Sequence, residues 1–193
     1  MRLIGASEDG TSDTGNPPRP VALPPGRLQG VATVDLVKVT DDDKPALGNL
    51  IQFYCYELSA VRHFEVTKHG LYVYRYLDHY FVDSDREAFF VRHGDALAGF
   101  ALSRQLVSGE REVAEFFVMR RHRRHAVGRR AADQLFARHA GTWVVAYDDD
   151  NGDAAAFWPP VIQAAADGEP HRDHIGPPEH RFAQTVLRFS IHQ

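Results

Sequence analysis

The chain has 193 residues, a hydrophobic content of 44% and a formal net charge of -4, which fits one globular domain with some additional chain. This mild acidity argues against a general nucleic-acid-binding protein, since such domains are usually basic overall. The single cysteine, Cys55, excludes an internal disulfide and a cysteine-based zinc site, and the lack of a long apolar run or secretory pattern predicts a cytoplasmic protein without a membrane partner.

The first 30 residues differ in composition from the rest. Between Gly5 and Gly30 the sequence is dense in glycine, proline, serine, aspartate and threonine, with few large apolar residues. Such a segment buries too little apolar surface to offset the entropy that ordering costs. We therefore predict a flexible N-terminal tail over residues 1–30 and a folded domain over residues 31–193.

A strand and a helix open the domain. Residues 34–40 alternate as a strand does, and Thr40 or Asp41 then caps a helix whose acidic start suits the positive end of the helix dipole. Cys55 is predicted to be a small buried hydrophobic residue rather than a nucleophile. One helical face is marked by the spacing of Leu47, Leu50, Ile51, Tyr54, Leu58 and Val61.

The segment 64–82 is rich in tyrosine and has no single period. Residues 71–76 alternate, whereas residues 76–82 are compatible with a helix. The tyrosines either pack with their rings buried and their hydroxyls in water, or they line a binding pocket. The sequence leaves both interpretations open.

Three strands are predicted next. Residues 87–92 and 96–102 flank the hairpin turn His93-Gly94-Asp95. After a polar loop, residues 113–119 have the β-branched, aromatic and apolar composition of a buried strand, apart from Glu115.

A basic turn and a helix follow. Residues 120–129 include five arginines, and apolar residues then recur at helical spacing. The free N–H groups of a first helical turn form an anion site, and the small residues Ala126 and Gly128 would let a phosphate approach the backbone. An ordinary strand–helix turn with a solvated basic face would give the same pattern.

The remaining chain is predicted to contain a helix stop at Ala140-Gly141, a strand over residues 142–147, a helix from Asn151, a polar connection over residues 165–179 and a final strand over residues 182–191. Four histidines near the end lack a carboxylate framework, so we predict no metal site: His171, His174, His180 and His192.

Two signatures carry a family resemblance. The turn Arg123-Arg124-His125-Ala126-Val127-Gly128 resembles the coenzyme A pyrophosphate loop of the GNAT N-acetyltransferase superfamily, with alanine in place of the first glycine. The stretch from Asn151 to Trp158 resembles the second GNAT signature, an asparagine followed seven positions later by an aromatic residue. The sequence of residues 114–118, together with Phe157-Trp158, is similar to that of predicted bacterial acetyltransferases of unassigned substrate.

The resemblance implies an α/β (α+β) GNAT fold. Its central sheet would be mixed and mostly antiparallel, with about six to seven strands, about four flanking helices, and a splay between the fourth and fifth strands. The implied activity is direct transfer of an acetyl group from acetyl-CoA to a primary amine in a ternary complex. The expected partners are acetyl-CoA and an amine-bearing small molecule or peptide, without metal or nucleic acid, and family members often form homodimers.

The resemblance also implies site residues. The backbone N–H of Val118 would stabilise the oxyanion. Trp158 occupies the slot of the family's general-acid tyrosine, and an indole has no useful acidity. The implied cofactor contacts are Phe116, Phe117, Val118, Arg123, Arg124, His125, Ala126, Val127, Gly128, Arg129, Asn151 and Trp158.

The general base and the acceptor contacts are less determined. Glu115 is the best candidate base, because a carboxylate inside an apolar strand should have a raised pKa. It could instead shape the acceptor pocket. Tyr147, Glu57 and Asp78 are weaker candidates for the base. The candidate acceptor contacts are Tyr54, Glu57, Tyr72, Asp78 and Tyr80.

Two other functions stay open. Trp158 in the acid slot is compatible with a non-catalytic acetyl-CoA-binding sensor or assembly domain. The arginines of residues 120–130 could grip an anionic partner such as a phosphate backbone, although the net acidity of the chain argues against this.

Overall fold

The computed structural model describes residues 32–178 and 181–192, and the chain from Ala32 onward forms one compact unit. The predicted flexible tail, residues 1–30, lies outside the described residues.

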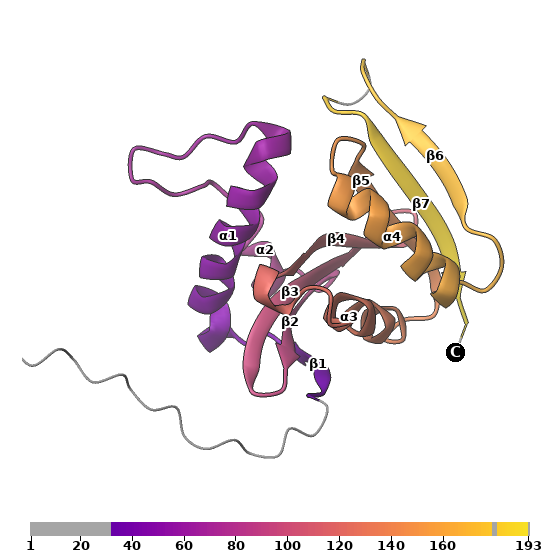
Figure 1. Ribbon diagram of the computed structural model, residues 1–193, viewed down its shortest axis with the longest axis horizontal. Helices are drawn as coiled ribbons and strands as arrows, with labels where there is room; N and C mark the ends of the chain where they lie inside the picture. Colours follow the sequence, from indigo (N-terminus) through magenta and orange to yellow (C-terminus); the bar gives the residue numbers. More distant parts are fainter. Residues whose placement is uncertain (1–31, 179–180, 193) are drawn as a thin grey trace, which may run out of the picture. The chain divides into compact units, whose positions relative to one another are not determined.

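Seven strands form one sheet in the order β1-β2-β3-β4-β5-β7-β6 (Figure 1). All neighbouring strands pair antiparallel except β4 and β5, which pair parallel. This confirms the predicted mixed, mostly antiparallel sheet. The strands are β1 Val34–Lys38, β2 Arg86–His93, β3 Ala96–Gln105, β4 Arg111–Val118, β5 Gly141–Asp148, β6 His171–Ile175 and β7 Gln184–Ile191.

Helices cover both faces of the sheet. The helix α1, Lys44–Arg62, and the short α2, His79–Val82, pack on one face, and α3, Val127–Phe136, with α4, Gly152–Ala165, on the other (Figure 1). Strand β2 shows why two cores form: Phe89 and Val91 belong to the core under α3 and α4, whereas Ala88 and Phe90 belong to the core under α1. Successive side chains of a strand point to opposite faces, so one strand serves both cores.

The sheet opens between β4 and β5. Their parallel pairing covers only Arg111 to Val113, opposite Trp143 to Val145. On the β3 side, Leu102 pairs with Glu115 and Ser103 with Val113, which leaves Ala114 as an extra residue in a β-bulge. Because a bulge bends its strand, β4 leaves β5 just before Glu115. The predicted splay is confirmed.

Two local predictions are confirmed. Cys55 is buried, as expected, and Thr40 caps the 3-10 turn before α1, its N–H donating to the carboxylate of Asp43 over 3.1 Å. The predicted stop of α3 at Ala140-Gly141 was wrong. The helix ends at Phe136, and Gly141, with φ 115°, begins β5 instead.

One further prediction needs correction. Residues 165–179 are not only a connection, because they contain β6, whose polar sequence suits an edge strand that pairs with β7 alone.

The segment whose structure the sequence left open forms no strand over residues 71–76, although residues 71–75 alternate in exposure. The side chain of Gln52 takes the place of a partner strand there, accepting from the N–H of Tyr72 over 2.8 Å and donating to its carbonyl over 3.2 Å.

Candidate active site

A cavity of about 1080 Å³ lies at the opening between β4 and β5. Its lining comes from one face of α1, the last three residues of β4, the basic turn after β4 and the first two turns of α4. We call it the main cleft. It is large enough for an extended, drug-sized or larger ligand.

The basic turn at one end of the main cleft has an unusual backbone. Arg124 and Ala126 have φ values of 63° and 57°, in the left-handed region, and α3 begins directly after Ala126. A non-glycine residue in this region costs roughly 1 kcal/mol or more, and such strain gathers at functional sites. The positive φ of Ala126 is a conformation that glycine adopts without strain, and glycine is the residue of the resembling coenzyme A loop at this position.

Gly128 and Gly99 are fixed by close packing. A Cβ at Gly128 would lie 3.1 Å from the ring of Phe157, which also lines the cleft. A Cβ at Gly99 on β3 would lie 1.9 Å from the carbonyl oxygen of Phe117. The first contact packs the start of α3 against α4, and the second packs β3 against the end of β4.

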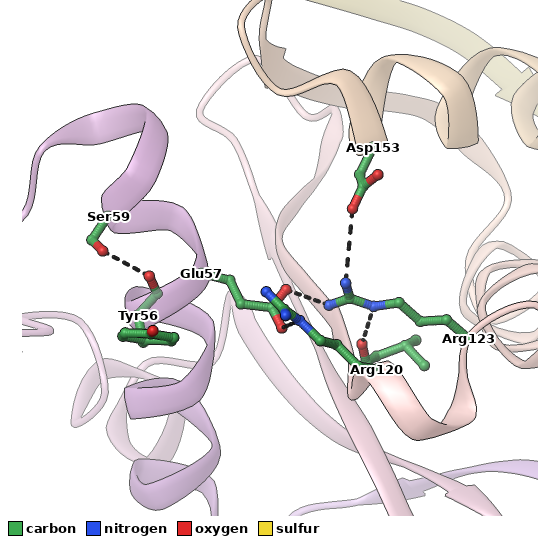
Figure 2. Close-up of polar contacts among 7 residues, drawn as sticks. Tyr56, Glu57, Ser59, Arg120, Arg123 and Asp153 are labelled. Carbon is green, nitrogen blue, oxygen red and sulfur yellow. Dashed lines mark hydrogen bonds and ion pairs between the residues drawn. The ribbon is translucent and has the colours of Figure 1, made fainter.

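Arg123 ties three elements together at the cleft mouth (Figure 2). Its Nε donates to the carbonyl of Val118 over 2.7 Å, and one terminal nitrogen donates to Glu57 of α1 over 2.5 Å. The other terminal nitrogen lies 3.8 Å from Asp153 at the start of α4. Arg120 donates to the second oxygen of Glu57 over 3.0 Å. Glu57 therefore gathers two positive side chains beside the turn.

The other predicted cofactor residues divide into two groups. Eight line the main cleft: Phe116, Phe117, Val118, Arg123, Arg124, Gly128, Asn151 and Trp158. Four belong to the turn without lining the cleft. His125 bonds the Arg123 carbonyl over 2.7 Å, Ala126 is exposed, Val127 is buried in the core, and Arg129 lies 3.9 Å from Asp133.

The second signature forms the far wall of the cleft. Asn151 caps α4, its side-chain oxygen accepting from the N–H of Ala154 over 3.1 Å. Trp158 is only 6% exposed and packs edge-on against Phe116, with ring centroids 5.1 Å apart. The indole therefore fills the wall, and no phenol stands in its place.

Glu115 faces a second cavity of about 340 Å³ on the α1 side of β4. We call it the side pocket. Its carboxylate accepts hydrogen bonds from the hydroxyl of Tyr54 over 2.5 Å and from that of Tyr74 over 3.3 Å. The rest of the lining comes from α1 and from the irregular segment 64–76.

Burial sets the acidity of this cluster. It raises the pKa of Glu115, although the two phenol hydrogen bonds and the nearby Arg62 oppose that rise. Burial and the negative charge of Glu115 raise the pKa values of Tyr54 and Tyr74. Both phenols thus keep their protons, and Glu115 is the group of this cluster that can act as a base.

The structure brings only some of the predicted acceptor residues together. Tyr54 and Tyr72 line the side pocket, whereas Glu57 lines the main cleft. Asp78 is exposed and lies 2.9 Å from Lys44, and Tyr80 is buried beneath the guanidinium of Arg86. Neither is among the residues lining the two cavities.

Sequence reasoning missed Tyr74 and Arg62. The alternation of residues 71–76 places Tyr72 and Tyr74 on one side, and that signal was available. Arg62 is positioned by contacts that no local pattern shows: it donates to the buried Asp148 of β5 over 2.6 Å and 3.0 Å. Tyr147, a weaker base candidate, is buried in the opposite core.

Within residues 32–178 and 181–192, no group of three or more histidine, cysteine, aspartate or glutamate side chains is placed to hold a metal ion. None of the helices in this described part is long and apolar enough to cross a membrane.

Comparisons with known proteins agree on one family. The model of the acetyltransferase (GNAT) family matches residues 53–159. An acetyltransferase of Thermus thermophilus has a similar structure at 21% identity, with a TM-score of 0.64 over 84% of this chain and 100% of that one. No curated protein matches the sequence.

Two similar structures have named acceptors. A ribosomal-protein alanine N-acetyltransferase of Escherichia coli has 14% identity and a TM-score of 0.51, over 83% of this chain and 96% of that one. A variant of the spermidine N-acetyltransferase of Vibrio cholerae has 10% identity and a TM-score of 0.56, over 81% and 93%. At such identities the likeness concerns the fold alone.

Proposed function

The chain belongs to the acetyltransferase (GNAT) family, and from this premise we propose that it transfers an acetyl group from acetyl-CoA to a primary amine. The two substrates would meet in a ternary complex, with acetyl-CoA in the main cleft and the amine in the side pocket. The observation that carries the proposal is the departure of β4 from β5 directly before Glu115. Along β4, Glu115 then lines the side pocket, and Phe116 to Val118 line the main cleft.

The residues of the main cleft suit the two ends of acetyl-CoA. The strained turn presents backbone amides at the start of α3, and Arg124 lines the cleft beside it, a combination that suits a diphosphate. Phe116 to Val118 lack β5 as a partner, so a pantetheine arm would have backbone groups to bond. Acetyl-CoA would supply an activated acyl group, its thioester.

Three protein groups would then carry the chemistry. The backbone N–H of Val118 would donate to the carbonyl oxygen as negative charge develops there. Glu115 would accept a proton from the acceptor nitrogen, which must lose protons to become an amide. Aromatic side chains of the side pocket, among them Phe64, Tyr72 and Tyr76, would surround the rest of the acceptor.

The acceptor is proposed only as a class. The carboxylates of Glu65 and Glu115 and the aromatic rings of the side pocket suit a cationic or aromatic primary amine. Asp78 and Tyr80 have no part in this proposal. We further propose that the protein works in the cytoplasm and without metal; a homodimer is a proposal from the family resemblance alone.

The test is acetyl transfer to a panel of amines. Release of the coenzyme A thiol would be followed with spermidine, with a peptide that begins with alanine and with tyramine, the first two chosen from the structural relatives. Acetylated product confirmed by mass spectrometry is the expected result. If none of these three amines and no amine of a wider set is acetylated, the proposed acetyltransferase activity is contradicted.

One observation supports a second function. Trp158 fills the wall where the family's proton donor stands, so the alternative is a non-catalytic acetyl-CoA-binding sensor or assembly domain. Tight binding of acetyl-CoA with no transfer to any amine is the result that would favour it.

A further inference from the structure

Acetyl transfer leaves a proton to be delivered to sulfur. An ammonium loses two protons on its way to the amide, and the departing thiolate must gain one. Trp158 cannot act as that donor, because an indole N–H has no useful acidity. A side chain that protonates the thiolate is therefore one other than Trp158, and this inference rests on the proposed function.

Tyr54 stands between the two cavities. Of the two phenols bonded to Glu115, Tyr54 lines both the main cleft and the side pocket, whereas Tyr74 lines the side pocket only. Glu115 itself lines the side pocket and not the main cleft. A proton that Glu115 takes from the amine is therefore in the side pocket, whereas the thiolate would form in the main cleft. Tyr54 lines both cavities.

We propose that Tyr54 is a catalytic proton relay from Glu115 to the leaving sulfur. One ammonium proton goes to solvent. The second goes to Glu115 as the C–N bond forms; the C–S bond breaks, the Tyr54 hydroxyl gives its proton to sulfur, and the proton on Glu115 passes to the Tyr54 oxygen. Glu115 and Tyr54 end as they began, and the products are the amide and the free thiol.

The hydrogen bond already present fits this transfer. The Tyr54 hydroxyl donates to Glu115 over 2.5 Å, within the range of O–H···O⁻ bonds. Alone, Tyr54 would be a weak donor, because burial and the Glu115 charge raise its pKa. Once Glu115 is protonated that charge is gone, and the net donor becomes a carboxylic acid. An ordinary glutamic acid, with a pKa of about 4.3, is more acidic than an ordinary thiol at about 8.5, and the burial that raises the pKa of Glu115 narrows this difference.

Tyr74 provides a matched control. It bonds the other oxygen of the same carboxylate, over 3.3 Å, and its hydrogen bond lowers the pKa of Glu115 in the same sense as that of Tyr54. The ring of Tyr54 packs edge-on against Phe100 and Phe117, and a phenylalanine would keep those contacts. Tyr54→Phe and Tyr74→Phe therefore each remove one hydroxyl that is bonded to Glu115. Only the Tyr54 variant changes a residue that also lines the main cleft.

The kinetic test compares these two variants. With spermidine, the alanine peptide, tyramine and water as acceptors, Tyr54→Phe should lower kcat by about 10²-fold or more, with the KM for acetyl-CoA unchanged. Tyr74→Phe should lose much less kcat than Tyr54→Phe, with its main effect on the KM for the amine, because Tyr74 lines the side pocket and its hydroxyl tunes the base. Equal losses in both variants, or no loss in Tyr54→Phe, would overturn the relay while leaving the acetyltransferase intact.

A second readout needs no substrate. The carboxyl carbon of Glu115, followed by NMR in the free protein, should titrate at a higher pH in both variants, since each loses a hydrogen bond that favours the carboxylate. A similar upward shift in both, beside a large loss of kcat in one, would assign that loss to proton delivery. A shift confined to Tyr54→Phe would reduce Tyr54 to a residue that tunes Glu115, and the relay would be wrong. Wild-type protein that releases no thiol with any acceptor would instead contradict the function and the relay together.

Discussion

The main cleft and the side pocket share Tyr54 and Leu58 in their linings but are built in different ways. The main cleft depends on backbone features, namely the end of β4, a turn with two left-handed residues and the first turns of α4, with one face of α1 beside them. The side pocket is closed by the irregular segment 64–76, which two hydrogen bonds from the Gln52 side chain hold against α1. Backbone geometry suits a cofactor that a whole family shares, whereas a segment fixed by side chains can change with the acceptor.

The largest effect expected from this comparison is at Glu115. Glu115→Gln should lower kcat by about 10²- to 10⁴-fold, the usual contribution of a general base. Because Glu115 lines only the side pocket, the affinity for acetyl-CoA measured by calorimetry should not change. Wild-type turnover in this variant would show that Glu115 merely shapes the pocket.

The pH dependence of turnover should report the same carboxylate. Burial raises the pKa of Glu115, and a base works only when deprotonated, so kcat/KM for the amine should rise with pH through a value above the ordinary 4.3 or so for glutamate. Glu115→Gln should lose this acid limb. An acid limb that persists in the variant would assign the base to another group.

Gln52→Ala should separate the two cavities. Loss of both hydrogen bonds to Tyr72 loosens segment 64–76, so the KM for the amine should rise by about tenfold. This corresponds to roughly 1.4 kcal/mol, which fits the loss of two partly buried hydrogen bonds. The KM for acetyl-CoA should stay the same. Gln163→Ala, on the exposed side of α4, is the matched control. An equal rise in both KM values would mean that the cavities are not independent.

The smallest expected effect concerns the strained turn. Ala126→Gly should stabilise the protein by roughly 1 kcal/mol, because glycine adopts the left-handed region without the steric cost that alanine bears. Ala164→Gly, on the exposed surface of α4, should instead destabilise by about 0.5–1 kcal/mol. Urea unfolding of both variants measures the difference. A destabilised Ala126→Gly would show that the turn carries no such strain.

The sequence predicted most of the fold because its strands and helices carry regular apolar spacing. The opening between β4 and β5 was predicted from the family resemblance rather than from residue patterns. Strand β6 could not be read, because the polar edge strand His171–Ile175 lacks an alternating apolar face.

The site was predictable in the same uneven way. The turn from Arg123 to Gly128 is continuous in sequence, so its motif survives in a single chain. The side pocket joins Glu115 to Tyr54 and Tyr74, which lie 61 and 41 positions away. The choice of Asp78 and Tyr80 rested on nearness in sequence to other tyrosines. Tyr80 does share a side-chain hydrogen bond with Tyr74, but neither Tyr80 nor Asp78 lines one of the two cavities.

Titration with coenzyme A, followed by backbone amide NMR, tests the central claim most directly. Saturable binding should shift the amides of residues 124–129 and of residues 116–118, while the amides of segment 64–76 change little. Absence of binding, or shifts confined to segment 64–76, would contradict the assignment of the main cleft to the cofactor.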